Sequence, residues 1–165
     1  MGDGAWQMAG GIVILALLYA ELRRDEGVRT TPYKDTQGKL TVGVGHNLTA
    51  LPLPAGWTYP LTQAQITQLL IADVASTLAQ LDARAKWWRT LSEVRQRVVA
   101  NMAFNLGVDK FLGFARAIAA MKDGGWDTAA DEMQSSLWFK QVGARAVRLC
   151  DAMRADVMPV AAGVA

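Results

Sequence analysis

Cysteine and histidine are almost absent from this chain of 165 residues, which contains one of each, Cys150 and His46. A single thiol cannot close a disulfide within the chain, and these two side chains cannot complete a four-ligand zinc site. Any Ser-His-Asp triad or Cys-His dyad would have to use His46, the only histidine of the chain. The sequence therefore predicts no metal and no cofactor, and it leaves carboxylates as the available catalytic reagents.

A strong excess of one charge is also lacking, because 17 Lys and Arg residues are balanced by 15 Asp and Glu residues. This balance argues against a polycationic nucleic-acid-binding protein. Residues 1–83 carry a net charge of −2 and residues 84–165 one of +4. The second half would tolerate an anionic polymer, although such an imbalance more often reflects a solvated face.

An uncharged stretch covers residues 4–20 near the N-terminus. Its length is at the lower limit of the roughly 17–25 residues that a membrane-spanning helix needs. No basic residue precedes it, whereas Arg23 and Arg24 follow it, which is unlike a simple signal peptide. Three interpretations stay open: the first helix of a globular protein, a permanent membrane anchor, and a marginal segment that inserts and later leaves.

Short elements are expected between residues 21 and 61. The helix that begins in the apolar stretch is predicted to end at Gly27, a typical C-cap residue. Leu40, Val42 and Val44 alternate with small or polar residues, which predicts a strand. The turn at Gly38 favours a hairpin in which that strand is the second one.

Helices are expected in the rest of the chain. Thr62 and Gln65 have the spacing of a capping box at the start of a helix about 30 Å long. Ser92 is predicted to cap another helix, and further helices are expected around residues 112–121 and 128–133 and from Val142 to Val157. The predicted class is α+β, divided into an apolar segment 1–20, a mixed lobe 21–61, an inter-lobe helix 62–83 and a helical lobe 84–165.

Two carboxylates and a hydroxyl follow one another closely along the mixed lobe. Glu26 stands at the predicted helix end, Asp35 at the start of the hairpin, and Thr41 on its return strand. A helix end and a hairpin can face each other across a groove. Hydrolysis of a glycosidic bond needs such a set: one carboxylic acid, a second carboxylate, and a group that positions water.

Residues 22–48, LRRDEGVRTTPYKDTQGKLTVGVGHNL, resemble the catalytic signature of the phage-type lysozymes, glycoside hydrolase family 24. The shared pattern is Glu-x8-Asp-x5-Thr, set within D-E-G, Y-K-D and G-x-x-T-x-G-x-G-H. Further matching positions lie in residues 97–107 and at Gly113-Phe114, Trp126-Asp127 and Trp138-Phe139. The resemblance extends over about residues 20–155 and implies a lysozyme-like fold.

The resemblance also implies roles for individual residues. Glu26 would be the general acid, while Asp35 and Thr41 would activate water with inversion at the anomeric carbon. The supporting ion pairs it implies are Arg145 with Glu26, Arg148 with Asp25, and His46 with Asp73. Its substrate contacts are Phe104 and Asn105, although the spacing of Phe104 also suits a core helix.

A phage-type lysozyme would act as a monomeric endolysin on bacterial peptidoglycan. Residues 1–20 resemble a signal-anchor-release segment, which inserts transiently into the inner membrane before the enzyme acts in the host periplasm. The alternative location is the host cytoplasm, with release through a holin as functional partner. The alternatives are a lytic transglycosylase, against which Asp35 and Thr41 argue, and a non-catalytic wall-binding module, against which the intact set of Glu26, Asp35 and Thr41 argues.

Overall fold

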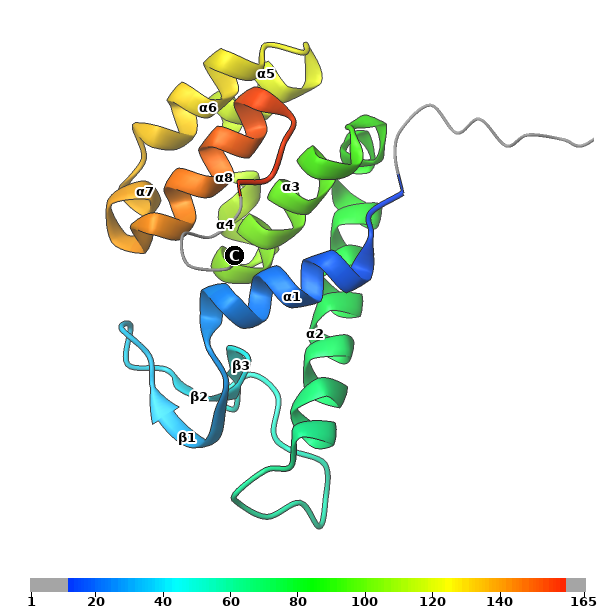
Figure 1. The fold of residues 1–165 in the computed structure, drawn as a ribbon, viewed down its shortest axis with the longest axis vertical. Helices are drawn as coiled ribbons and strands as arrows, with labels where there is room; N and C mark the ends of the chain where they lie inside the picture. Colours follow the sequence, from blue (N-terminus) through cyan, green and yellow to red (C-terminus); the bar gives the residue numbers. More distant parts are fainter. Residues whose placement is uncertain (1–11, 160–165) are drawn as a thin grey trace, which may run out of the picture.

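The structure, a computed structural model, describes residues 12–159, which form a small lobe with a sheet and a larger helical lobe (Figure 1). This arrangement confirms the predicted α+β lysozyme-like class. The two ends of the chain, residues 1–11 and 160–165, lie outside the described residues. The elements are α1 Leu15–Glu26, β1 Arg29–Lys34, β2 Leu40–Gly43, β3 His46–Asn47, α2 Gln63–Arg84, η1 Lys86–Thr90, α3 Glu93–Leu106, α4 Val108–Leu112, α5 Ala115–Lys122, α6 Trp126–Gln134, α7 Leu137–Val142 and α8 Ala144–Ala155.

The sheet has three antiparallel strands in the order β1-β2-β3, and Tyr33 of β1 lies opposite Thr41 of β2. The prediction of one strand continuing through Val44 is wrong, because the chain reverses after β2 and forms β3. Gly43 and Gly45 have φ of 66° and 70°, a left-handed backbone conformation that glycine adopts without steric cost. The second turn brings the segment after β2 back beside it.

The long helix α2 connects the sheet to the helical lobe along one side of the molecule (Figure 1). Its first turn is closed by a capping box, in which Thr62 Oγ1 accepts from Gln65 N and Gln65 Oε1 accepts from Thr62 N. Ile66, Leu70 and Leu81 are buried along one face at helical spacing. The helix thereby fixes the sheet relative to the helical lobe.

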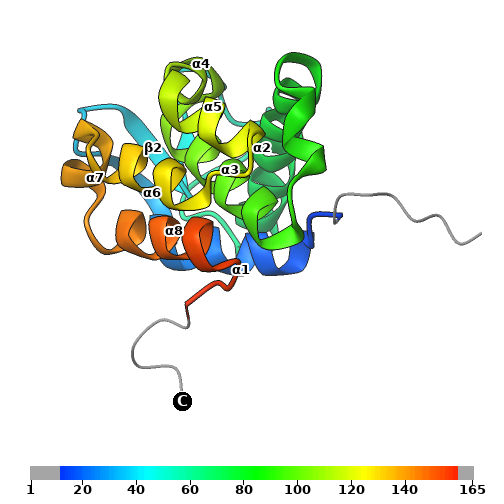
Figure 2. The ribbon, with the colours of Figure 1, turned by 90° about the horizontal axis from the view of Figure 1, so that it is seen from above.

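The helical lobe is built around α3, which packs against α1, α2, α4 and α8 (Figure 2). Residues 95–103 of α3 are all buried. Two predicted helices are wrong in extent. The one expected around residues 112–121 is α5, which begins only at Ala115, and the last one is α8, which begins after Gly143, whose φ is 65°, and ends at Ala155. The short helices α4 and α7, which precede them, were not predicted.

Helix α1 lies across the junction of the two lobes (Figure 1) and places Glu26 at its last position. Leu18 and Leu22 are buried against the core, whereas Ile12, Leu15 and Leu17 are exposed. Only part of the predicted segment 1–20 is described. Among residues 12–159, no helix combines the length and apolar character needed to cross a bilayer.

Candidate active site

Asp35 is held at the turn between β1 and β2 by the backbone that follows it. Its Oδ1 accepts hydrogen bonds from Gln37 N and Lys39 N, both at 2.8 Å. The backbone adds a bond from Asp35 N to Lys39 O at 2.9 Å. An aspartate that bonds its own turn in this way is fixed in orientation. The bonds to Oδ1 leave Oδ2 as the oxygen that can accept a proton.

Thr41 lies on β2 with its side chain almost completely buried. Its hydroxyl donates to the carbonyl oxygen of Lys39 at 3.0 Å. Because the only proton of that hydroxyl is used, Thr41 Oγ1 offers its lone pairs as an acceptor. The turn thus orients both the carboxylate and the hydroxyl through Lys39.

Glu26 is the last residue of α1, followed by Gly27 with φ of 74°. Its Oε1 accepts a hydrogen bond from Arg145 Nη1 at 2.6 Å. On another side it meets Gly45, where a Cβ atom would lie 3.2 Å from the Glu26 carboxyl carbon. In the sequence, Gly45 was only one position of the G-x-x-T-x-G-x-G-H pattern. The structure shows that a larger residue at this position would press on the carboxyl group of Glu26.

The three predicted catalytic residues line one cleft of about 550 Å³. Glu26 contributes from the end of α1, and Asp35 and Thr41 contribute from the hairpin. Phe104 and Asn105, at the end of α3, line the opposite side. The structure therefore brings together all five residues for which the sequence predicted catalysis or substrate contact.

The cleft continues in both directions as a groove. One neighbouring hollow, of about 290 Å³, shares the hairpin tip and Asn105 with the cleft. Another, of about 260 Å³, shares Gly45, Asn47 and Phe104 with it and reaches α2. An elongated groove with the carboxylates near its middle suits a polymer that extends past both sides of the reacting bond.

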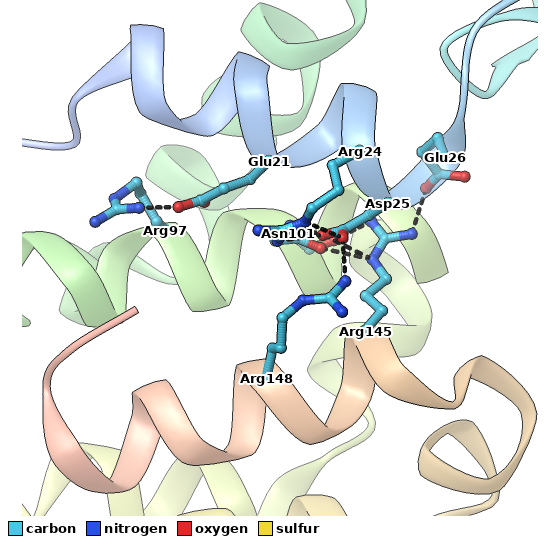
Figure 3. A network of polar contacts seen from close by, with 8 residues as sticks. All are labelled: Glu21, Arg24, Asp25, Glu26, Arg97, Asn101, Arg145 and Arg148. Atoms are coloured by element: carbon cyan, nitrogen blue, oxygen red, sulfur yellow. Dashed lines mark hydrogen bonds and ion pairs between the residues drawn. The ribbon is translucent and has the colours of Figure 1, made fainter. Parts of the chain in front are cut away.

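A network of charges behind the cleft connects α1 with α3 and α8 (Figure 3). The Asp25 side chain has no exposed area, and Arg148 donates to its Oδ1 at 2.5 Å. Asn101 donates to Asp25 Oδ2 at 3.0 Å and accepts from Arg145 Nε at 2.8 Å. Burial acts to raise the pKa of Asp25, but hydrogen bonds from Arg24 and Asn101 and the charge of Arg145 outweigh it and lower that pKa.

Asn101 was not predicted to be a site residue, although it accepts two hydrogen bonds from Arg145. Besides the bond to its side-chain oxygen, Arg145 Nη2 donates to Asn101 O at 3.4 Å. Glu21 was also missed, and it pairs with the buried Arg97 (Figure 3). Burial raises the pKa of Glu21 despite the charge of Arg97. Glu21 and Asp25 are four positions apart on α1 and therefore lie on the same face of the helix. This spacing was the sequence feature from which the two carboxylates could have been predicted to meet the same neighbouring helices.

His46 lies on β3 and pairs with Asp73 of α2. Its Nδ1 donates to Asp73 Oδ2 at 2.7 Å, and its Nε2 donates to the carbonyl oxygen of Leu51 at 2.8 Å. The hydrogen bond to Asp73 raises the pKa of His46, although burial opposes it. Both ring nitrogens are occupied by structural partners, so His46 attaches the sheet to α2.

Asn105 is oriented by Trp138, whose indole Nε1 donates to Asn105 Oδ1 at 2.9 Å. That bond leaves the amide NH₂ of Asn105 as its donor toward a ligand. The role of Trp138 was not predicted from its position in the family pattern. Within residues 12–159, no group of three histidine, cysteine or carboxylate side chains is arranged to hold a metal ion.

Comparisons with known proteins identify relatives of this chain. The chain is 30% identical over 148 residues to the pre-baseplate central spike protein Gp5 of Enterobacteria phage T4, covering 78% of this chain but only 26% of that relative. It is 26% identical to probable T4-type lysozyme 1 of Dictyostelium discoideum over 78% of this chain and 88% of that protein. A SAR-endolysin of Bacteriophage PS34 is 35% identical over 86 residues, which are 52% of this chain and 48% of that relative.

The first of these relatives is thus about four times longer than the aligned segment, whereas the second is matched over most of its length. The family model described as Phage lysozyme matches residues 23–153, which include the small lobe after the first turns of α1 and nearly the whole helical lobe. The chain belongs to the phage lysozyme family, a lysozyme class of glycoside hydrolases.

Proposed function

We propose that this chain is a muramidase that hydrolyses the β-1,4 bond between N-acetylmuramic acid and N-acetylglucosamine in peptidoglycan. The observation that carries the proposal is the lining of one cleft by Glu26, Asp35 and Thr41. An acid from a helix end and a water-binding pair from a hairpin are the groups that glycoside hydrolysis requires. The family membership adds the lysozyme class of substrate.

In the proposed reaction Glu26 is the general acid. Arg145 occupies Glu26 Oε1, so Oε2 is the oxygen that gives its proton to the leaving glycosidic oxygen. The bond from the anomeric carbon to that oxygen breaks while a water molecule attacks the same carbon from the opposite face. The glycosidic oxygen leaves as a hydroxyl group, and the sugar becomes a hemiacetal.

The attacking water is held by Asp35 and Thr41. Asp35 Oδ2 takes up one water proton, and Thr41 Oγ1 accepts a hydrogen bond from the other. Because the two groups belong to one rigid turn, the water is oriented before the bond breaks. Attack on the face opposite to the leaving oxygen inverts the anomeric configuration, so a β linkage yields an α product.

The groove favours an internal bond of the glycan as the point of cleavage. It continues past the carboxylates toward α2 on one side and toward α7 on the other. Sugars on both sides of the scissile bond can therefore contact the protein, with Phe104 and Asn105 on the wall opposite the hairpin. This geometry supports an endolysin that lyses the host cell by fragmenting the wall.

The experiment that tests this function compares the wild type with Glu26→Gln on purified peptidoglycan. Loss of turbidity with the wild type and none with the variant supports the acid, provided that circular dichroism shows both folded. Mass spectrometry of the products separates hydrolysis, which leaves a reducing end, from transglycosylation, which leaves a 1,6-anhydro end. Full activity of Glu26→Gln would remove the assignment.

We further propose that the enzyme acts as a monomer in the host periplasm and that residues 4–20 first insert transiently into the inner membrane. The uncharged composition of this stretch and the similarity to a SAR-endolysin support the insertion. The alternative is accumulation in the host cytoplasm until a holin opens the membrane. Fractionation of cells that lack a holin decides: membrane-associated and periplasmic enzyme supports insertion, and enzyme confined to the cytosol contradicts it.

A further inference from the structure

Tyr33 lines the catalytic cleft but has no part in the reaction described above. It lies on β1, directly opposite Thr41 of β2. Residues that face each other across an antiparallel pair point to the same side of the sheet, and so do residues two positions apart along one strand. Tyr33 therefore shares a face of the hairpin with Thr41 and with Asp35, which follows the end of β1.

The ring of Tyr33 is contacted on one face by Arg29 of the same strand. The guanidinium carbon of Arg29 lies 5.0 Å from the ring centroid, a distance at which a cation is attracted to the face of an aromatic ring. The pairing of β1 with β2 is irregular between these two residues, and such an irregularity changes the direction in which side chains point. The protein thus holds the ring in place at the wall of the cleft.

The hydroxyl of Tyr33 has no hydrogen-bond partner among residues 12–159. Burial raises the pKa of this phenol, the charges of Glu26 and Asp35 raise it as well, and the charge of Arg29 opposes the rise. The hydroxyl is therefore protonated at neutral pH, and it is close enough to both carboxylates for their charges to act on it. A protonated hydroxyl without a partner offers one donor to a ligand in the cleft.

A sugar in the cleft presents two polar groups next to its reacting carbon. In the proposed reaction, this sugar lies between Glu26 and the water bound by Asp35. Its ring oxygen gains positive charge in an oxocarbenium-like transition state and is then a poor acceptor of hydrogen bonds. The acetamido group on C2 keeps the lone pairs of its carbonyl oxygen, so this oxygen is the better partner for a donor.

We propose that Tyr33 is a further catalytic residue, whose hydroxyl donates a hydrogen bond to the acetamido carbonyl oxygen of the sugar that carries the reacting carbon. This inference rests on the proposed muramidase function. An acetamido group trans to the leaving oxygen can itself attack the anomeric carbon, as in glycosidases that use the substrate as nucleophile. A donor that holds the carbonyl oxygen aside leaves water as the attacking group.

The test compares two soluble glycan substrates of equal length, one with the natural acetamido group on the reacting sugar and one with a hydroxyl group in its place. The oxygen of that hydroxyl is two bonds nearer the ring than the acetamido carbonyl oxygen, so it cannot replace it. Steady-state kinetics gives kcat/KM for each substrate. Because one neutral hydrogen bond is lost, Tyr33→Phe is expected to lower kcat/KM about two- to ten-fold for the acetamido substrate and to leave it unchanged for the hydroxyl substrate.

The substitution Tyr33→Phe removes little besides the proposed donor. It keeps the ring that Arg29 contacts, and the hydroxyl that it removes bonds to no residue in the described part of the chain, so denaturant titration is expected to show wild-type stability. Tyr59→Phe is the matched control, because Tyr59 is an exposed tyrosine in the loop before α2 and lies outside the cleft. It is expected to keep both wild-type values of kcat/KM.

The outcomes separate the inference from the function on which it rests. Equal kcat/KM of Tyr33→Phe and the wild type on the acetamido substrate would overturn the inference and leave the muramidase function standing. An equal loss on both substrates would also overturn it, as would a wild type that cleaves both substrates equally well, whether or not the variant folds. Failure of the wild type to cleave the acetamido substrate would overturn the proposed function and the inference with it.

Discussion

Arg145 of α8 donates a hydrogen bond of 2.6 Å to Oε1 of Glu26, which stands 119 positions earlier at the end of α1. The same guanidinium is bonded to Asn101 of α3 and lies 3.7 Å from the buried carboxylate of Asp25. The position of the proposed acid is therefore determined by the helical lobe as well as by its own helix. Contacts far from the substrate can in this way influence catalysis.

Replacing Arg145 should affect both stability and catalysis. We predict that Arg145→Gln lowers kcat, because Glu26 loses the partner that fixes its carboxyl group. Removal of one member of a buried charge network costs about 3 kcal/mol of unfolding free energy. Denaturant titration and steady-state kinetics measure the two effects.

The control is Arg154→Gln, since Arg154 pairs with Asp127 and Asp131 on an exposed surface. Its expected cost is about 0–1 kcal/mol, with kcat unchanged. A kcat for Arg145→Gln equal to that of the wild type would show that the ion pair does not position the acid.

Gly45 should be required for the acid to keep its position. We predict that Gly45→Ala reduces activity far more than stability, because the new Cβ would lie 3.2 Å from the Glu26 carboxyl group. The left-handed φ of 70° adds a backbone strain of about 1–2 kcal/mol. Gly56→Ala is the matched control, because Gly56 has φ of 84° but nothing within 4 Å of an added Cβ. Comparable losses of activity in both variants would contradict the proposed contact.

The pair of His46 and Asp73 should make stability depend on pH. Because the hydrogen bond to Asp73 raises the pKa of His46 above 6.5, its contribution is fully present below pH 6.5 and is lost as pH rises through the pKa of the folded state. We predict that Asp73→Asn destabilises the protein more at pH 5.5 than at pH 9. Chemical denaturation of both proteins at the two pH values measures this difference. A constant difference would contradict a charged His46.

Trp138 should act on substrate binding through Asn105. We predict that Trp138→Phe raises KM more than it lowers kcat, because the indole N–H that orients the Asn105 amide is lost. The ring packing against Phe114, with centroids 6.2 Å apart, is largely retained by phenylalanine. The lost hydrogen bond costs about 1 kcal/mol of stability. The account of Asn105 would fail if KM stayed at its wild-type value in a folded variant.

Local signals in the sequence were sufficient for the elements that depend on neighbouring residues. The capping box at Thr62 and the cap at Ser92 predicted the starts of α2 and α3, and both caps are present. The spacing from Glu26 to Asp35 and Thr41 predicted that the three residues lie close together, because a helix end followed by a tight hairpin has few other possible arrangements. Their chemical roles stay a prediction.

Other features depend on contacts that no local pattern encodes. The third strand requires the chain to reverse between Gly43 and Gly45, where the sequence shows only two glycines in an alternating run. Asn101 and Glu21 became part of the site network only once α1 was packed against α3. The hollow of about 290 Å³ beside the hairpin tip likewise exists only because the hairpin faces α4 and α7.

The anomeric configuration of the first product tests the central claim most directly. Proton NMR of a soluble peptidoglycan fragment, recorded within seconds of adding enzyme, distinguishes the α from the β hemiacetal before they interconvert. If Glu26 protonates the leaving oxygen while Asp35 and Thr41 direct water to the opposite face, the α anomer forms first. An initial β anomer would contradict that arrangement.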